Sequence, residues 1–298
     1  MLAGLARPSD SRAEIVSAAM RIVTYRSDRG ARAGLLRGES IVDVWDRLDG
    51  EGSTVRDLLA AGRLGELDGL AGTDTDADVA DVELLPPVPD PDKIVCIGLN
   101  YRAHAAEAGI EPPEAPTFFA KFRNALAPPG ATVDLPGASR KVDFEAEIAF
   151  VVGRRCKGVE ESEASDCVAG YTLLNDLSAR DLQFATPQWM PGKVFDSSAP
   201  CGPALVTPDE ALADGPISFS LDLNGERMQE ATTNDLIFGV PQLVAHLSRL
   251  MTLEPGDLVA TGTPAGVGST REPRVWLKPG DEIAISSPTL GRLETRIA

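Results

Sequence analysis

The alternation of apolar and polar residues predicts a chain built mainly from β-strands. Asn224-Gly225, between two such alternating runs, predicts a tight hairpin, whereas residues 55–61 and 236–250 repeat their apolar positions at helical spacing. The candidate strands cover residues 21–25, 34–37, 40–46, 93–97, 145–152, 170–174, 204–206, 217–223, 257–261 and 282–285. Many strands with few crossover helices predict a mixed α/β fold, mainly β, of the sandwich or roll type and not a doubly wound sheet.

An acidic stretch followed by a proline-rich one predicts a domain boundary. Residues 72–78 are polar and acidic, and residues 84–89 read Leu-Leu-Pro-Pro-Val-Pro, so we place the boundary between about residues 72 and 90. The predicted parts are a small N-terminal domain with its linker, residues 20–88, and a larger domain, residues 89–298. Residues 1–19 lack the apolar core of a secretory signal and are interpreted as an upstream extension or a start-site artefact.

Charge and cysteine content narrow the range of functions. A net charge of −17 over 298 residues argues against a nucleic-acid partner, and no apolar run is long enough for a membrane span. The four cysteines form no C-x-x-C pair, and two histidines are too few for a zinc site. We therefore expect free thiols and a cytoplasmic location, and any bound metal is expected to be held by oxygen.

The segment 141–152 carries the strongest chemical signal. As a strand, it places Val142, Phe144, Ala146 and Ile148 on one face and Asp143, Glu145 and Glu147 on the other. Carboxylates gathered on one face of an apolar strand repel one another unless a cation lies among them, and carboxylate oxygens suit Mg²⁺, Mn²⁺ or Ca²⁺. The alternative is a solvated edge strand.

Four other segments contain residues suited to catalysis or binding. His104 and Glu107 lie at i, i+3 of a probable helix, where the carboxylate can hold one imidazole nitrogen and leave the other as a base. The alternative is a surface histidine beside an incidental glutamate. Lys193 precedes a rigid Pro/Gly turn and suits the stabilisation of an enolate, although an ordinary loop lysine fits the same position.

The segment 175–183 follows a predicted strand and begins a helical turn. Asp176 is placed to be a third metal ligand, and Arg180 and Gln183 share a face that suits a ligand carboxylate. Helix capping by Asp176 with a surface ion pair at Arg180 is the alternative. In the Gly-rich segment 261–268 the backbone can approach a ligand closely, with the Thr263 hydroxyl as a donor.

Together these segments resemble the fumarylacetoacetate hydrolase family over about two-thirds of the chain, from Lys93 to the C-terminus. The resemblance rests on five motifs in the family's order: Gly98-Leu99-Asn100-Tyr101-x-x-His104-x-x-Glu107, Phe144-Glu145-Ala146-Glu147, Asn175-Asp176-x-Ser178-Ala179-Arg180-Asp181-x-Gln183, Lys193-x-x-Asp196-x-x-x-Pro200-x-Gly202-Pro203 and Thr261-Gly262-Thr263-Pro264-x-Gly266-Val267-Gly268.

The resemblance implies a mixed β-sandwich roll with a small N-terminal domain, a homodimer, and one Mg²⁺ or Mn²⁺ ion. The implied metal ligands are Glu145, Glu147 and Asp176. The implied catalytic residues are His104 and Glu107, a water-activating dyad on a lid that orders when substrate binds, and Lys193, which stabilises the enolate. The implied substrate-binding residues are Arg180, Gln183, Thr263 and Lys121.

The leading hypothesis is a metal-dependent hydrolase that cleaves a C–C bond in acylpyruvate-type 2,4-dioxo acids, such as fumarylpyruvate, to give pyruvate and a carboxylic acid. The alternative is an isomerase or decarboxylase of 2-hydroxymuconate-like or oxaloacetate-like diacids on the same metal–enolate site. A third class, a ligand-binding protein on an inactive enzyme fold, predicts the loss of a metal ligand, and all three ligands are present.

Overall fold

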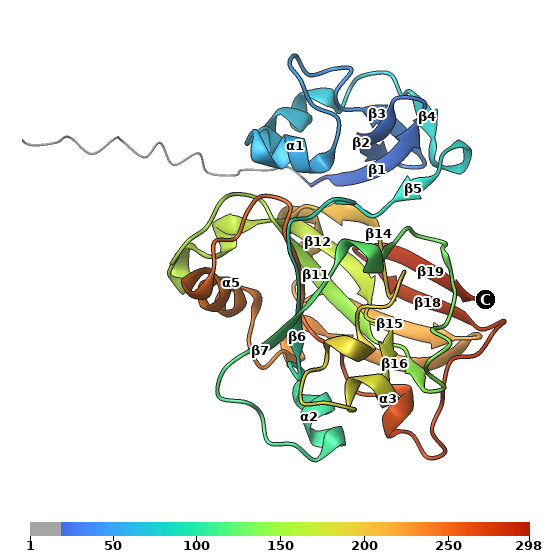
Figure 1. Ribbon diagram of the computed structural model, residues 1–298. Coiled ribbons are helices and arrows are strands. Elements are labelled where there is room, and N and C mark those ends of the chain that lie inside the picture. Colours follow the sequence, from blue (N-terminus) through green and yellow to red (C-terminus); the bar gives the residue numbers. More distant parts are fainter. Residues whose placement is uncertain (1–18) are drawn as a thin grey trace, which may run out of the picture.

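The computed structural model describes residues 19–298 as two large sheets, a short two-stranded ladder and five α-helices (Figure 1). The larger sheet runs in the order β4-β3-β2-β1-β14-β12-β11-β17-β6-β7, with β5 beside β1 and β8 beside β14. Its strands are β1 (Arg21–Ser27), β2 (Gly30–Arg37), β3 (Ser40–Asp43), β4 (Ala77–Asp78), β5 (Leu84–Leu85), β6 (Ile94–Gly98), β7 (Thr117–Lys121), β8 (Leu126–Ala127), β11 (Ala146–Val152), β12 (Val168–Asn175), β14 (Ala199–Val206) and β17 (Leu258–Ala260). The mixed fold of mainly strands predicted from the sequence is confirmed.

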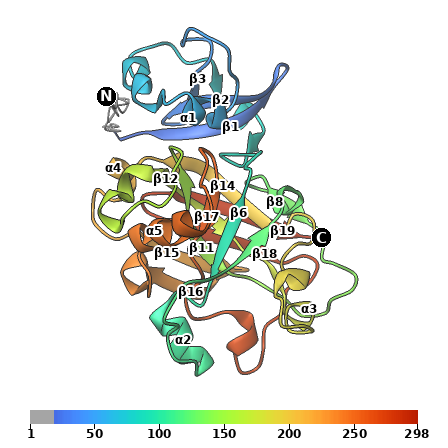
Figure 2. The same ribbon diagram turned by 60° about the vertical axis from the view of Figure 1, so that its left-hand side comes forward.

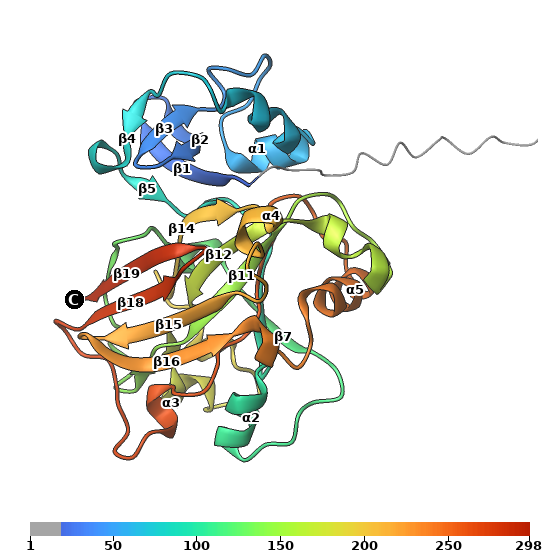
Figure 3. The ribbon, with the colours of Figure 1, turned by 180° about the vertical axis from the view of Figure 1, so that it is seen from behind.

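The second sheet has the order β16-β15-β18-β19-β9 and is best seen from behind, in Figure 3. Its strands are β9 (Thr132–Val133), β15 (Ser218–Leu223), β16 (Glu226–Thr232), β18 (Glu282–Ser287) and β19 (Gly291–Ile297). The two-stranded ladder pairs β10 (Val142–Asp143) with β13 (Ser178–Ala179). Asn224 and Gly225 make the predicted hairpin between β15 and β16, with φ of 53° and 82°.

The helices are short and lie at the margins of the sheets. They are α1 (Val55–Ala60), α2 (Arg102–Ala108), α3 (Arg180–Gln183), α4 (Pro208–Ala211) and α5 (Val240–Leu250). A capping box between Thr54 and Asp57 starts α1, which agrees with the predicted helix at 55–61. The predicted helix at 236–250 begins later, at Val240, because Leu236 forms an isolated bridge with Tyr101 and Pro241 occupies the first turn of α5.

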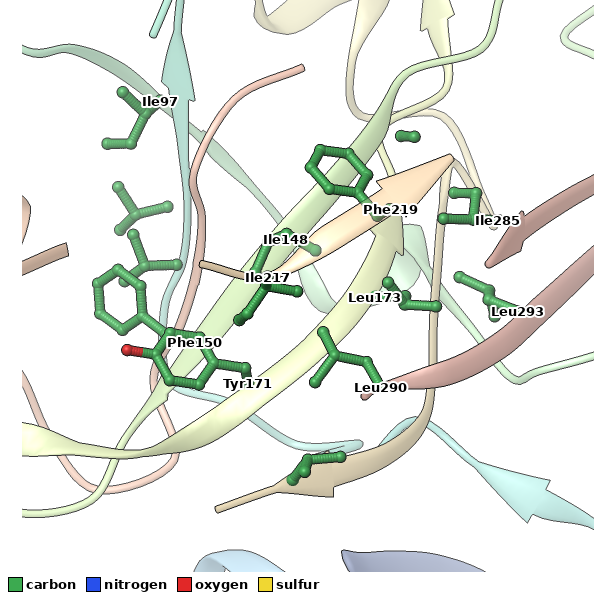
Figure 4. Packing of buried hydrophobic residues seen from close by; sticks show 14 of the residues in the cluster. Ile97, Ile148, Phe150, Tyr171, Leu173, Ile217, Phe219, Ile285, Leu290 and Leu293 are labelled. Carbon is green, nitrogen blue, oxygen red and sulfur yellow. The ribbon is translucent and has the colours of Figure 1, made fainter. Parts of the chain in front are cut away.

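The main apolar core lies between the two sheets. Ile148, Phe150 and Val152 alternate along β11 on the face that packs in this core, whereas Ala149 and Val151 belong to the core on the opposite face. Figure 4 shows residues of the larger sheet packed against those of the second: Ile148, Phe150, Tyr171 and Leu173 on one side, and Ile217, Phe219, Ile285, Leu290 and Leu293 on the other. The predicted alternation therefore holds from residue 145 onward, and it turns Glu145 and Glu147 away from the core between the sheets.

The N-terminal strands are part of the larger sheet. Arg21 and Ile22 of β1 pair with Val206 and Leu205 of β14, and Met20 N donates to Thr207 Oγ1 at 2.9 Å. Figures 1 and 2 show β1–β5 and α1 as a cap on the larger body. The division at residues 72–90 stays a prediction, and the proposed extension, except for Ala19, lies outside the described residues.

One expectation about the cysteines is wrong. Cys156 and Cys167 form a disulfide, with their Cα atoms 6.6 Å apart. The segment between β11 and β12 folds back on itself, and this return brings together two cysteines that sequence spacing alone does not pair. Cys96 and Cys201 are free, as predicted, and both are buried. Between residues 19 and 298 no helix is both long and apolar enough to cross a bilayer.

Candidate metal centre

Three carboxylates meet where β11 and β12 lie side by side. Ala146 of β11 faces Asn175 of β12, so that Glu145 and Glu147 on either side of Ala146 come next to Asp176, which follows β12. Ligand oxygens from Glu145, Glu147 and Asp176 all lie within 4.8 Å of one another, and all three side chains are buried. This all-oxygen donor set fits a hard divalent cation such as Mg²⁺ or Mn²⁺.

Buried cations surround two of the three carboxylates. Lys193 Nζ donates to Glu145 Oε2 at 2.6 Å and to Asp176 Oδ2 at 2.7 Å, while Lys121 Nζ donates to Asp176 Oδ1 at 2.7 Å. Arg180 Nη1 lies 2.6 Å from Glu145 Oε1. Lys121 and Lys193, both predicted from the sequence to face the site, are 2% exposed.

Among the described residues, the third carboxylate, Glu147, forms no direct ion pair, and Lys193 acts on it only through its charge. Its Oε2 accepts from the backbone N–H of Gly262 at 2.8 Å. Burial, followed by the charges of Asp176 and Glu145, raises the pKa of Glu147 well above its usual range. For Glu145 burial also acts to raise the pKa, but Arg180 and Lys193 outweigh it and lower the pKa to about 2. A dication among the three oxygens would supply the positive charge that Glu147 lacks, so the residues fit the metal that the sequence predicts.

Asp143 does not join the other acids of its segment. The strand predicted across residues 141–152 is broken, because β10 ends at Asp143 and β11 begins only at Ala146. Asp143 instead pairs with Arg180 at 2.8 Å and accepts the backbone N–H groups of Gly268 and Ser269 at 2.7 and 3.0 Å. It therefore ties Arg180 to the 268–269 turn, and the predicted row of three carboxylates on one face is corrected to two plus Asp176.

The guanidinium of Arg180 is engaged by protein groups. Besides Asp143 and Glu145, its Nη1 donates to Gln183 Oε1 at 3.0 Å, as expected for residues that share one face of α3. The sequence predicts that Arg180 and Gln183 hold a ligand carboxylate. In the structure both line the cavity described below, already bonded to each other.

His104 and Glu107 lie on α2 and form the predicted pair. His104 Nδ1 is 3.1 Å from Glu107 Oε2, and Glu107 Oε1 accepts the backbone N–H of Gly266 at 3.0 Å. With Nδ1 protonated, the ring donates to the carboxylate and leaves Nε2 as the free nitrogen. Figures 1 and 2 place α2 at the end of the molecule remote from β1–β5.

Gln229 of β16 is a buried residue beside the site that the sequence does not indicate. Its Oε1 accepts from Ala146 N at 2.9 Å, and its Nε2 donates to Thr263 Oγ1 at 2.8 Å and to Pro264 O at 2.9 Å. The second sheet thus holds both the residue between the two glutamates and the predicted substrate-binding Thr263. Nothing in the local pattern around Gln229 signals this role, because its partners are distant in sequence.

These groups surround a cavity of about 350 Å³. Polar lining comes from His104, Glu145, Glu147, Asp176, Arg180, Gln183, Lys193, Thr263, Ser269 and Thr270, and apolar lining from Ile97, Gly98, Leu99, Ala108, Ile110, Phe119, Phe184 and Trp189. Of the ten predicted site residues, eight line the cavity. The other two, Lys121 and Glu107, bond directly to lining residues. Their individual roles in a reaction stay predictions.

The fold and the buried carboxylate site define a class of protein, and sequence comparison agrees with it. Residues 93–298 match the family model described as fumarylacetoacetate (FAA) hydrolase C-terminal, and the chain belongs to the fumarylacetoacetate hydrolase family. The family resemblance inferred from the five motifs is thereby confirmed.

Among individual relatives, the chain is 41% identical over 220 residues to the mitochondrial oxaloacetate tautomerase FAHD2B of Bos taurus, covering 73% of this chain and 70% of the relative. Among solved structures, a putative HpcE protein from Mycobacterium smegmatis superposes with a TM-score of 0.84 at 36% identity, covering 94% of this chain and 99% of that one. Maleylpyruvate hydrolase from Sphingobium sp. SYK-6 superposes with a TM-score of 0.77 at 31% identity, covering 94% and 99%. The chain is thus a family enzyme whose relatives include both tautomerases and hydrolases.

Proposed function

We propose that the protein is a divalent-metal-dependent enzyme that interconverts the enol and keto forms of a small 2-oxo acid, with oxaloacetate as the reference substrate. The observation that carries the proposal is the buried group of Glu145, Glu147 and Asp176, with Lys193 and Lys121 hydrogen-bonded to it beside the cavity. Such preorganised positive charge stabilises the negative charge that develops on an enolate oxygen.

Enol-to-keto conversion needs only the movement of a proton. The O–H bond of the enol breaks, a C–H bond forms at C3, and no other atom is gained or lost. Mg²⁺ or Mn²⁺ held by the three carboxylates would polarise the 2-oxo oxygen of the substrate. The Lys193 ammonium remains charged, because Asp176 and Glu145 raise its pKa against the effect of burial. His104 lines the cavity, and in the proposed reaction its Nε2 accepts the enol proton and delivers it to C3.

The named activity of a relative supports placing tautomerisation ahead of C–C hydrolysis. The sequence motifs alone favour C–C hydrolysis first and an isomerase or decarboxylase second, whereas the 41% identical bovine relative is named an oxaloacetate tautomerase. Tautomerisation and acylpyruvate cleavage pass through the same kind of enolate, so the shared motifs do not separate the two reactions. The isomerase alternative is therefore the better supported of the two.

Hydrolysis of a 2,4-dioxo acid is the second candidate, and one observation favours it. The pair of His104 and Glu107, at 3.1 Å, is an arrangement that activates water. In that reaction a water proton moves to His104 Nε2 and the hydroxide attacks the distal carbonyl. The C–C bond then breaks to give a carboxylic acid and the enolate of pyruvate, and the proton on Nε2 passes to the enolate carbon to complete pyruvate.

The test follows the ultraviolet absorbance of enol-oxaloacetate with enzyme plus Mg²⁺, enzyme plus EDTA, and Mg²⁺ alone. We expect metal-dependent loss of the enol band that exceeds the Mg²⁺ background, with oxaloacetate conserved and no pyruvate formed. Pyruvate from oxaloacetate would indicate a decarboxylase, and pyruvate plus acetate from acetylpyruvate would indicate a hydrolase. An enol band that decays at the background rate would contradict the proposal.

A further inference from the structure

The charges of the site match a substrate with a single carboxylate. Three carboxylates, those of Asp143, Glu145 and Asp176, contact three cations, Lys121, Lys193 and Arg180. The fourth carboxylate, Glu147, lies beside them without a direct contact to any of the three cations. The cluster is therefore left with one uncompensated negative charge, and a bound dication converts this to one net positive charge. One substrate carboxylate neutralises that charge. A second carboxylate would be buried without a matching cation, which is costly.

No lysine or arginine in the cavity wall is spare for a second carboxylate. In the described part of the chain the only such side chains in the lining are Lys193, held by Glu145 and Asp176, and Arg180, held by Asp143, Glu145 and Gln183. Apart from the carboxylates, these two cations and His104, the lining residues are uncharged.

An aromatic wall starts directly beside the charged cluster. Lys193 Nζ lies 5.1 Å from the centre of the Phe119 ring, and the Phe119 and Trp189 rings meet edge to face at 5.9 Å. Gly98 makes room for Trp189, because a Cβ on Gly98 would lie 2.2 Å from the indole ring. The indole is thus packed against the backbone of β6, where only glycine allows the contact.

Two exposed apolar side chains continue this wall outward. Phe184 follows α3, immediately after Gln183, and Ile110 follows α2, which carries His104. Phe184 is 65% exposed and Ile110 is 53% exposed, yet both line the cavity. Large apolar side chains that stay exposed around a cavity mark a surface for an apolar ligand group.

We propose that the enzyme's preferred substrate is a 2-oxo monocarboxylic acid with an aryl or branched alkyl arm, and that Phe184, Trp189 and Ile110 bind this arm. The inference rests on the proposed function and adds the substrate class. It assigns these three residues to specificity, whereas the carboxylates and lysines act on the 2-oxo acid group common to all substrates.

The first experiment compares kcat/KM for the enol forms of phenylpyruvate and oxaloacetate. We expect wild type to favour phenylpyruvate at least tenfold, and Phe184→Ala to lower that preference about tenfold, as expected for about 1.4 kcal/mol of lost apolar contact. Phe184→Arg, which adds a cation for a second carboxylate, should shift the preference toward oxaloacetate. Phe122→Ala is the matched control, because Phe122 is 52% exposed but does not line the cavity, and should change neither rate.

A binding measurement supports the kinetic one. N-phenyloxamate is a non-reacting 2-oxo acid analogue with an aryl arm. With Mg²⁺ present, calorimetry should show that it binds more tightly than oxamate, and Phe184→Ala should reduce this difference in affinity. Metal-dependent turnover that favours oxaloacetate would overturn the inference and leave the proposed function intact, whereas turnover of neither enol would overturn the proposed function. A changed oligomeric mass for Phe184→Ala would also overturn the inference, because a second copy of the chain would then cover Phe184.

Discussion

Two clusters of buried charge, one in the N-terminal part and one at the candidate metal centre, differ in how their charges are balanced. The N-terminal cluster is formed by the buried Tyr25, Arg32 and Asp43, with the exposed Asp46 at its edge. The Asp43 carboxylate accepts from the Tyr25 hydroxyl, the Arg32 guanidinium and the backbone N–H of Asp46. Burial acts to raise the pKa of Asp43, but the hydrogen bonds from Arg32 and Tyr25 outweigh it and hold the pKa below its usual value. Every charge at Asp43 has a partner within the protein.

At the metal centre the balance is incomplete. Glu145 has Arg180 and Lys193 beside it, whereas Glu147 has one backbone N–H and two neighbouring carboxylates that raise its pKa. A carboxylate whose charge is balanced by groups of the chain stabilises the fold. A buried carboxylate whose charge is not balanced by the chain is suited to bind a cation. Burial alone does not separate the two, because Asp43 and Glu147 are about equally buried.

The largest expected effect comes from removing the unbalanced carboxylate. Glu147→Gln should lower activity by more than about 100-fold, because changes in the groups that merely support metal ligands already cost ~10–100-fold. In EDTA the same variant should melt at or above the wild-type temperature, because substitution removes the cost of burying the Glu147 carboxylate and its repulsion with Asp176 and Glu145. Scanning fluorimetry with Mg²⁺ and with EDTA measures the melting temperatures of the metal-bound and metal-free proteins. Mg²⁺ should raise the melting temperature of wild type but not that of the variant. A clear fall in the melting temperature of the metal-free variant would mean that Glu147 stabilises the fold as Asp43 does, and would contradict the contrast between the two carboxylates.

The balanced carboxylate should behave in the opposite way. Asp43→Asn should lower the free energy of unfolding by about 3 kcal/mol, the low end for a broken buried ion pair, because Arg32 keeps Asp46 as a partner at 2.8 Å. Activity per folded molecule should not change. Urea denaturation measures the loss, and Asp74→Asn, at an exposed aspartate of the same N-terminal region, is the control.

The pH dependence of that loss checks its cause. Because the folded pKa of Asp43 is below the unfolded value of about 3.8, its contribution is fully present above that pH and disappears as the pH falls through the folded pKa. The stability difference between wild type and Asp43→Asn should therefore be constant near neutrality and shrink below about pH 4. A difference that stays the same at low pH would mean that the Asp43 charge is not its source.

The smallest effect concerns the neutral link between the second sheet and the metal centre. Gln229→Met removes the acceptor for Ala146 N and the donor to Thr263. Stability should fall by about 2 kcal/mol, because a buried N–H loses its partner. We expect kcat to fall about tenfold with KM little changed. Loss of the two hydrogen bonds lets Ala146 and Thr263 move, and this movement misplaces groups near the reacting atoms.

Gln188→Met, the same exchange at an exposed position, should be silent in both measurements. Loss of stability in Gln229→Met without loss of kcat would show that Gln229 supports the fold alone.

The sequence predicts most of this site because its motifs stand at the ends of strong strands. Glu145, Glu147 and Asp176 lie at one end of the β11–β12 pair, whose alternating apolar residues set both register and face, and His104 and Glu107 are one helical turn apart. Local periodicity is enough to place such residues.

What the sequence does not predict depends on contacts between distant segments. Asp143 shares the residue spacing of Glu145 and Glu147, but the break after β10 turns it toward Arg180 and the 268–269 turn. The position of Gln229 beside Ala146 and the pairing of Cys156 with Cys167 likewise depend on the path of the chain, which the local sequence pattern does not predict. The alternation of apolar and polar residues predicts each strand separately. These features arise where a strand is broken or where distant segments come into contact.

The pairing of β1 with β14 has a consequence for the order of folding. Met20 and Thr207, which hydrogen-bond at the start of β1, are separated by 187 positions. During synthesis β1 leaves the ribosome long before its neighbour exists, so the edge of β1 that will face β14 waits unpaired while the intervening strands are made. Contacts of such long range slow folding and leave strand edges open to wrong partners. Closure of the larger sheet by β14 is therefore a late event, and it joins the first strand to the family domain only after most of that domain has been made.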